Sequence, residues 1–332
     1  MRPELLVCPK SDCGASGRIG VHSYTKRQYI CHACKKTFAE TTGTMLYDLK
    51  HSAWLVLLVL ALLAQSCPVP AIVFAFGLSE RTVADWQLKA GRYAKHLQSD
   101  VVCQAKLELG QVQADELYAK TQAGPVWIAP AMTVFSRLWL WGAIGWDRDQ
   151  RLIEQVVVQV RAAAKWGCPL LWAVDGFRAY PKAILKVFRD PLYSGRGGRP
   201  RLIVSDDLHI VQVVKERVGK RLKRVSKRVA YGCVARAEEL MQASQVLLGT
   251  ITTAYIERLN TTLRTWLPAL TRRTRTPSRA RERLEAALFW TGCVYNFCHV
   301  HATLAGTPAM AADLTDHVWS IEELIRYRCR RE

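Results

Sequence analysis

Four cysteines near the amino terminus occur as two close pairs, and they constrain this part of the chain more than any other feature. Cys8 and Cys13 form one pair, and Cys31 and Cys34 form the other. Two tight turns that each present two thiolates can close a tetrahedral site around one structural Zn²⁺ ion. So short a segment buries too little apolar surface to fold alone, so metal binding would supply its folding free energy. We predict a zinc ribbon over residues 1–44; the alternatives are a redox pair or unrelated buried thiols.

The next segment, residues 45–100, has a helical pattern. The run Ala53–Ala64 is apolar on nearly every side, which is typical of a buried helix. A short second helix is expected to end near Gly77, and Ser79 is placed to cap a third. This order predicts a small all-α helix-turn-helix domain that binds DNA; an ordinary three-helix bundle is the alternative. The exposed face of the third helix would supply the DNA contacts Arg81, Lys89 and Arg92.

Residues 105–305 alternate between β-rich and helical segments. We expect a first strand over Val112–Tyr118, which carries Asp115, and a later buried strand that ends on Asp175 at a glycine turn. Two more strands, over 127–134 and 138–146, and a helix over 149–166 lie between them. Functional groups collect at strand ends in sheets flanked by helices. The order predicts an α/β core of the ribonuclease-H-like type, with a mixed five-stranded sheet flanked by helices.

A third acidic residue of interest, Glu257, lies in a helical segment over 255–264. Asn260, Thr261 and Arg264 follow Glu257 at helical spacing and share its face. Carboxylates from separate elements can hold two Mg²⁺ (or Mn²⁺) ions, which serve phosphodiester displacement. Asn260 and Arg264 would then steer a phosphate backbone. Each acid considered alone could equally be an ordinary surface charge.

The charge balance points to a polyanionic partner. Lys and Arg number 47 against 28 Asp and Glu, a formal net charge of +19. Such a surplus favours nucleic acid, because every phosphate contact releases a counterion. The rival partner is an anionic membrane, but the longest apolar run falls far short of the roughly 20 residues that span a bilayer. We expect a soluble, cytoplasmic protein with no membrane partner.

Two dense basic segments extend this expectation. The first, Lys215–Arg228, is predicted to form a helix and lies within a basic insertion around 190–250. The second follows Glu257. Solvated helices are the alternative for both. Residues 306–332 would form a C-terminal helical tail. A second metal site formed by Cys293, Cys298, His299 and His301 is less favoured than a packed arrangement of these side chains.

The predicted DNA contacts in the two basic segments are Lys220, Arg221, Lys223, Arg224, Arg272 and Arg273.

The acidic blocks are similar to those of a known family. Asp115-Glu-Leu, Asp175-Gly-Phe-Arg-Ala-Tyr and Glu257-Arg-Leu-Asn-Thr-Thr-Leu-Arg resemble the three blocks of bacterial insertion-sequence DDE transposases. A zinc ribbon that runs into a helix-turn-helix also resembles the start of the zinc-ribbon members. The long interval between the second and third acids departs from many relatives and leaves Asp206 or Asp207 as an alternative third acid.

This resemblance implies a transposase. Asp115, Asp175 and Glu257 would bind two Mg²⁺ ions and catalyse 3′-end cleavage and strand transfer. The front domains would bind terminal inverted repeats, and a dimer or larger assembly would form on DNA. No nucleotide cofactor is expected. Two other functions stay open: a catalytically silent DNA-binding regulator derived from a transposase, and a structure-selective nuclease on the same fold.

Overall fold

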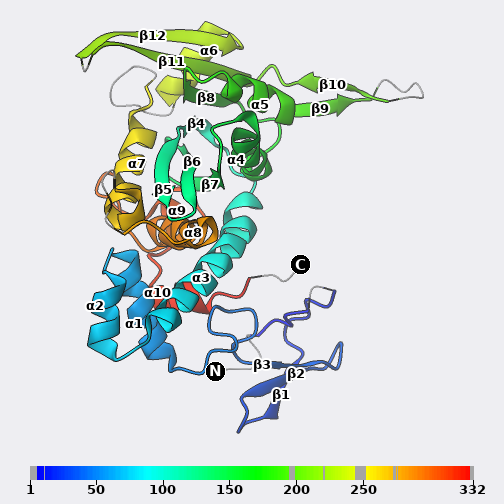
Figure 1. Ribbon diagram of the computed structural model, residues 1–332. Helices are drawn as coiled ribbons and strands as arrows, with labels where there is room; N and C mark the ends of the chain where they lie inside the picture. The colour runs from blue at the N-terminus through cyan, green and yellow to red at the C-terminus, as the bar shows by residue number, and fades with distance from the viewer. Residues whose placement is uncertain are drawn as a thin grey trace.

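A computed structural model of the chain has a mixed α/β fold, with a mixed sheet and flanking helices (Figure 1). It describes residues 6–10, 12–193, 199–219, 221–243, 252–271, 274 and 276–329. Within these ranges no helix is both long and apolar enough to cross a lipid bilayer.

The amino-terminal module is a three-stranded antiparallel sheet. Its strands are β1 (Ile19–Ser23), β2 (Gln28–Cys31) and β3 (Thr37–Ala39), in the order β1-β2-β3. Tyr29 and Phe38 pack together with ring centroids 5.9 Å apart. Its small core contains two of the four paired cysteines.

Three helices follow, as the sequence predicts: α1 (Ala53–Ala64), α2 (Val69–Phe76) and α3 (Glu80–Leu97). The Ser79 hydroxyl accepts a hydrogen bond from the Thr82 amide and so caps α3. Gly77 ends α2 with φ 63°, a left-handed conformation that favours glycine. The chain continues from α3 into the π-helical turn η2 (Gln98–Cys103).

A seven-stranded mixed sheet forms the centre of the molecule. Its continuous order is β12-β11-β8-β4-β6-β5, and β7 pairs with β6. Strands β4, β8 and β11 are parallel to one another, whereas β6 is antiparallel to β4. The strands are β4 (Gly110–Ala114), β5 (Leu117–Thr121), β6 (Gly124–Thr133), β7 (Trp139–Gly145), β8 (Leu170–Asp175), β11 (Leu208–Val218) and β12 (Arg221–Tyr231).

The prediction of five strands was wrong in two places. The predicted strand Val112–Tyr118 is interrupted at Asp115 and Glu116, and its halves β4 and β5 pair with different parts of β6. The predicted basic helix over Lys215–Arg228 is instead the antiparallel pair β11–β12. Strand β11 is held by backbone hydrogen bonding to β8, and Val211 and Val213 pack beside Leu171 and Ala173 on one face. Tertiary pairing thus overrides the local charge pattern.

Helices cover both faces of the sheet (Figure 1). Helix α4 (Gln150–Ala163) packs on β6 and β7, and α5 (Ala179–Val187) packs on α4. On the other face, α6 (Val234–Ala243) lies on β4, β8 and β11, and α7 (Ala254–Trp266) lies on β4 and β6. The turn η3 (Pro268–Leu270) follows α7, and a separate two-stranded sheet consists of β9 (Arg189–Leu192) and β10 (Arg201–Val204).

Helix α8 (Arg281–Phe297) joins the three-helix segment to the sheet. It packs along α3, where a Cβ added at Gly91 would lie 2.1 Å from the Ala286 carbonyl oxygen. Glycine is therefore required at this crossing of two helices. A single hydrophobic core runs through the three-helix segment, the sheet and α8.

The carboxyl-terminal segment contains only two short helices, α9 (Pro308–Ala311) and α10 (Ile321–Arg326), among its described residues. It returns to the amino-terminal half of the chain, where the Tyr93 hydroxyl shares its one hydrogen between the Leu324 and Tyr327 carbonyls, at 2.9 and 2.6 Å. The Met45 amide donates to the Ile325 carbonyl at 3.1 Å. The Arg328 guanidinium donates to the Glu40 carbonyl at 2.7 Å. This segment therefore links the three helices to the amino-terminal module.

Candidate functional sites

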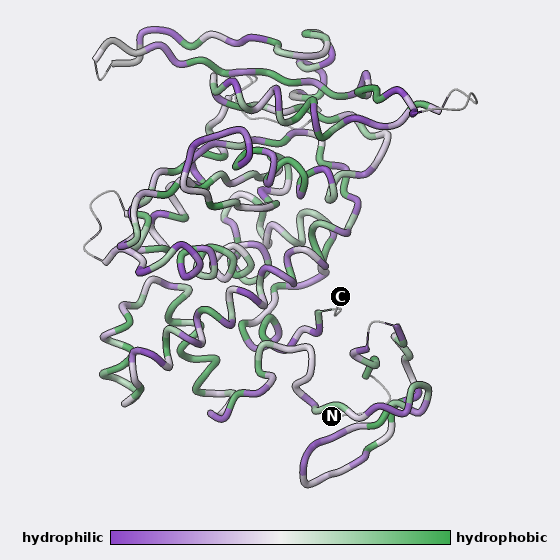
Figure 2. The backbone as a smooth tube through the Cα atoms, turned by 45° about the vertical axis from the view of Figure 1, so that its right-hand side comes forward, coloured by the Kyte–Doolittle hydropathy of each residue, from purple (hydrophilic) through white to green (hydrophobic). Residues whose placement is uncertain are grey.

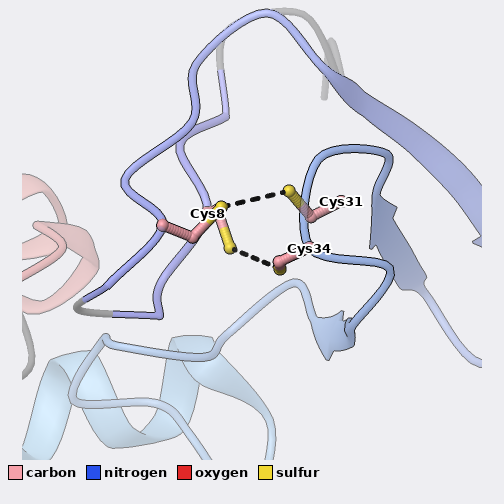
Figure 3. Close-up of side chains that lie close together, drawn as sticks. Cys8, Cys31 and Cys34 are labelled. Carbon is pink, nitrogen blue, oxygen red and sulfur yellow. Dashed lines mark hydrogen bonds between the residues drawn. The ribbon is translucent and has the colours of Figure 1, made fainter.

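The paired cysteines meet in one cluster. The four sulfur atoms of Cys8, Cys13, Cys31 and Cys34 all lie within 4.8 Å of one another. Cys8 is 3.7 Å from Cys34, and Cys13 is 3.7 Å from Cys31. A tetrahedral site with Zn–S bonds of ~2.3 Å requires sulfur atoms ~3.8 Å apart, so the spacing fits zinc. Figure 3 shows Cys8, Cys31 and Cys34 pointing toward a common centre.

Backbone amides prepare part of this cluster for a metal. Hydrogen bonds from the backbone of Cys34 and Ala33 lower the pKa of the Cys31 thiol to about 7. Burial raises the pKa of the Cys8 thiol to about 12. A cation that binds all four sulfurs would therefore have to displace protons, Cys8 being the most reluctant to lose its own.

An acidic cleft of about 900 Å³ lies at the carboxyl edge of the parallel strands. Asp175 ends β8, and Asp115 directly follows β4, the parallel neighbour of β8. Glu257 lies in the first turn of α7, which packs against β4. All three carboxylates that the sequence singled out line this cleft, together with Asn260 and Arg264.

The tightest acidic group at this edge of the sheet differs from the predicted trio, because it includes Glu116, which lies beside the cleft. Carboxylate oxygens of Asp115, Glu116 and Asp175 all lie within 4.8 Å of one another, and Glu257 is not part of this group. The Glu257 carboxylate instead accepts a hydrogen bond from the Thr253 hydroxyl at 2.7 Å and forms an ion pair with Lys215. Glu257 thus lies in the same cleft, but outside the group of three oxygens.

Arg148, which sequence reasoning missed, joins two of the carboxylates. Its guanidinium donates to Glu116 Oε2 at 2.7 and 3.0 Å and to Asp175 Oδ2 at 3.1 Å. The guanidinium carbon also lies 4.3 Å from the centroid of the Phe177 ring and 5.5 Å from that of Trp127. Arg148 belongs to the loop between β7 and α4, and no sequence motif in this loop indicates a functional role for it.

Burial and nearby negative charges raise the pKa values of two of these carboxyl groups, Glu116 and Asp115. The Glu116 side chain is 1% exposed, and burial and the Asp175 charge raise its pKa to about 7, despite the opposing effect of Arg148. Burial also raises the pKa of Asp115, and the charges of Asp175 and Glu257 add to that shift. A cation placed among these oxygens would relieve this repulsion.

Two buried glutamines hold the cleft together. The Gln113 side chain accepts hydrogen bonds from the Tyr255 and Ile256 amides at 3.1 and 3.0 Å, and it donates to the Thr252 carbonyl at 2.6 Å. It therefore fixes the amino terminus of α7 to β4. Gln212 of β11 donates to the carbonyls of Asp175 and Phe177, and so supports the loop after β8.

The alternative third acids lie elsewhere. Asp206 and Asp207 precede β11, and the Asp207 carbonyl accepts a hydrogen bond from the Leu170 amide at the start of β8. Because β8 and β11 are parallel, this places them at the amino edge of the sheet, opposite to Asp175. The structure thus separates them from the acidic cleft.

The predicted DNA contacts fall into several environments. On α3, Arg81 and Arg92 are exposed, whereas Lys89 is half-buried, donates to the Tyr47 carbonyl, and has its pKa lowered by burial. Lys223 and Arg224 are exposed on β12. Figure 2 shows hydrophilic stretches along these outer strands. Lys220, Arg272 and Arg273 lie outside the described residues, as does the side chain of Arg221.

The less favoured second metal site does not form. Among the described residues, the cysteine cluster and the acidic trio are the two groups that could hold a metal ion. Cys293 instead donates to the Ala94 carbonyl, and His299 stacks edge-on against Trp266. The His301 ring contacts the Thr303 hydroxyl at 3.0 Å. Cys293 is buried, whereas the His301 contact lies at the surface.

A scan against protein-family models gives no match to this chain, and a search of curated proteins finds no similar sequence.

Proposed function

We propose that this protein is a DNA transposase of the insertion-sequence type, with a ribonuclease-H-like catalytic domain. One observation carries the proposal: Asp115, Asp175 and Glu257, which are far apart in sequence, line one cleft at the carboxyl edge of a mixed sheet. The order β7-β6-β4-β8-β11, in which β6 alone runs against the others, supports the ribonuclease-H-like assignment.

The donor set of the cleft fits a pair of hard divalent cations. Its candidate ligands are carboxylate oxygens, the donors that Mg²⁺ and Mn²⁺ prefer. Beside the cleft, the Glu116 Oε1 atom is buried and makes no hydrogen bond of ordinary geometry among the described residues, although the Tyr180 hydroxyl interacts with this carboxylate. Asp115, Asp175 and Glu257 would hold the metal ions, with Glu116, whose carboxylate lies close to those of Asp115 and Asp175, as a further candidate ligand. When bound, the metal supplies Lewis-acid stabilisation of phosphodiester displacement.

The protein's own residues would organise the substrate. The Asn260 side-chain amide donates a hydrogen bond to Oδ2 of Asp115 and so fixes the orientation of the Asp115 carboxylate. Arg178 and Arg264 line the same cleft and would bind the phosphate backbone. In the first reaction a water oxygen joins the phosphorus, the P–O3′ bond breaks, and a 3′-hydroxyl remains. In the second, that hydroxyl attacks a phosphodiester of target DNA and displaces its 3′-oxygen.

The remaining modules would recognise DNA. The cysteine cluster would hold one structural Zn²⁺ ion, which completes a zinc ribbon. The capped helix α3, with Arg81 and Arg92 exposed, would act as the recognition helix of a helix-turn-helix that reads terminal repeats. The charge of +19 supports a polyanionic partner. Because two DNA ends must be joined to one target, we expect a dimer or larger assembly on DNA.

The test is a cleavage and joining assay on DNA taken from both sides of this protein's own gene. With Mg²⁺, we expect nicks at the two ends, followed by joining to a supercoiled plasmid. Asp175→Asn and Glu257→Gln should reduce both reactions at least about 100-fold, because a neutral amide replaces a metal-binding carboxylate. Asp206→Asn is the matched control, since this acid lies at the opposite edge of the sheet, and it should retain activity.

The outcomes separate the three functions. Cleavage without joining would favour a structure-selective nuclease. Binding that retards the DNA, without any cleavage, would favour a silent regulator. If Asp206→Asn were as inactive as Glu257→Gln, the assignment of the third acid would be wrong.

A further inference from the structure

We propose that Arg148 is a displaceable counter-ion: its guanidinium occupies a cation position between Glu116 and Asp175, and a divalent metal ion expels it. The inference rests on the proposed function for the identity of the substrate, but it concerns metal binding alone.

The geometry of Arg148 is that of a substitute cation. Its guanidinium contacts one oxygen of each carboxylate, Oε2 of Glu116 and Oδ2 of Asp175, at 2.7 and 3.1 Å. These same two residues belong, with Asp115, to the group of oxygens that lie within 4.8 Å of one another. A metal ion held by this group would compete with the guanidinium for its oxygens.

The second oxygen of Glu116 points to a further ligand. Oε1 is buried and makes no hydrogen bond of ordinary geometry among the described residues, although the buried Tyr180 hydroxyl interacts with the Glu116 carboxylate and lowers its pKa. The Glu116 side chain is 1% exposed. Arg148 satisfies only Oε2. A buried carboxylate oxygen without a partner is costly, so the bridge by Arg148 leaves this position incompletely satisfied. A metal ion bound by Glu116 could use this oxygen.

The Arg148 side chain also has an alternative position available once it leaves the carboxylates. Its side chain is 36% exposed, and the face of Phe177 already lies 4.3 Å from the guanidinium carbon. An arginine can keep an aromatic contact while its donors turn to a new acceptor. The cleft is the place where DNA phosphates would lie, so a released guanidinium could exchange carboxylates for phosphate. Metal loading and DNA binding would then favour each other.

The other carboxylate of the cleft shows the same arrangement. Glu257 is paired with Lys215, which also lines the cleft. Glu116, Asp175 and Glu257 are thus each paired with a cation of the protein itself.

The test measures Mn²⁺ binding to the full zinc-loaded chain without DNA, by electron paramagnetic resonance of free Mn²⁺. Arg148→Gln should bind Mn²⁺ roughly tenfold more tightly than the wild type, because no charge-assisted hydrogen bonds need to be broken. Arg178→Gln is the matched control: Arg178 lines the same cleft but forms no ion pair with another described residue. It should strengthen binding less than about threefold, through loss of long-range repulsion alone.

A competition experiment tests the cation position directly. In Arg148→Ala, millimolar methylguanidinium should weaken Mn²⁺ binding several-fold, whereas in the wild type it should have no effect. Sodium chloride at the same ionic strength controls for screening. A second measurement needs no loss of the side chain: the Arg148 Nε–H resonance, assigned by its disappearance in Arg148→Lys, should shift when Mg²⁺ is added to the wild type.

The proposal is overturned if Arg148→Gln binds Mn²⁺ no more tightly than Arg178→Gln and the Nε–H resonance stays in place under saturating Mg²⁺. Arg148 would then be a fixed support of the two acids. Its failure is distinct from failure of the proposed function. If metal binding expels Arg148 but the protein never cleaves DNA, this inference holds and the transposase assignment fails. If the protein cleaves and joins DNA while Arg148 stays in place, the transposase assignment holds and this inference fails.

Discussion

The side-chain amide of Asn260 lies 2.8 Å from Oδ2 of Asp115, although 145 positions separate the two residues in sequence. One residue comes from helix α7 and the other from the end of strand β4. This hydrogen bond joins the two elements that bring Glu257 and Asp115 to one cleft.

Asn260→Ala should lower the rate of DNA cleavage about 10- to 100-fold while the fold is retained, because one hydrogen bond of roughly 1–3 kcal/mol no longer orients Asp115. Single-turnover cleavage measures the rate, and circular dichroism checks the fold. Thr262→Ala, on the same helix but outside the acidic cleft, should cleave at the wild-type rate. Equal rates for both variants would show that Asn260 does not orient the acid.

Gln113 should anchor helix α7. Gln113→Ala removes three hydrogen bonds between β4 and the amino end of α7, and we expect the free energy of unfolding to fall by about 2–3 kcal/mol. Hydrogen exchange at the Tyr255 and Ile256 amides should accelerate. Gln111→Ala is the control, because Gln111 is also buried in β4 but its Oε1 has no partner among the described residues. If both variants accelerate hydrogen exchange in α7 equally, the Gln113 hydrogen bonds do not anchor this helix.

Glu116 should make the metal-free protein less stable at higher pH. Its pKa is raised to about 7 in the folded chain, so the folded state holds the proton more tightly than the unfolded state does. The resulting stabilisation is complete below the ordinary glutamate pKa and is lost as pH rises through about 7. Between pH 5 and 8, wild type should therefore lose about 1–3 kcal/mol relative to Glu116→Gln, which cannot titrate. Urea unfolding with a chelator present measures the difference; parallel profiles would contradict the raised pKa.

The cysteine cluster should contain one zinc ion per chain, measured by native mass spectrometry. Removing it with a strong chelator under reducing conditions should expose the chain to protease up to about residue 45, because the module has too little core to fold without metal. Cys31→Ser should have the same effect. Cys168→Ser, which changes a cysteine outside the cluster, should leave the zinc content unchanged. A metal-free module that resists protease would show that the cluster is not a folding element.

The outer strand β12 should bind the DNA backbone. Lys223→Gln combined with Arg224→Gln should weaken DNA binding and reduce the slope of log affinity against log salt by about 0.9 for each phosphate that the variant no longer neutralises. Lys165→Gln is the control, since Lys165 forms an ion pair with Glu108 at 2.5 Å near the amino edge of the sheet. An unchanged slope in the double variant would exclude β12 from the interface.

Local signals made the three-helix segment predictable. Apolar spacing defines α1 and α3, while Gly77 and Ser79 mark the end of one helix and the start of another. The position of Asp175 could be anticipated for a related reason, since it ends a strand that reads as buried, whereas the break of the predicted strand at Asp115 could not.

Other features depend on partners that are distant in sequence. Strand β12 forms by backbone pairing with β11, which no local pattern of charges indicates, so its sequence predicts a helix instead. Arg148 lies in a loop, and its role follows from Glu116 and Asp175, which β4 and β8 bring beside it. No spacing of residues around Arg148 could have indicated this contact.

The return of the final residues to the front of the molecule has a consequence for shortened genes. A copy interrupted before codon 320 would still encode every acid of the cleft. It would nevertheless lack the contacts that Leu324, Ile325 and Arg328 make with Tyr93, Met45 and Glu40. Such a product would keep the acids of the cleft but lose the carboxyl-terminal contacts that link the two front modules. A survey of its acidic residues alone would therefore wrongly score it as intact.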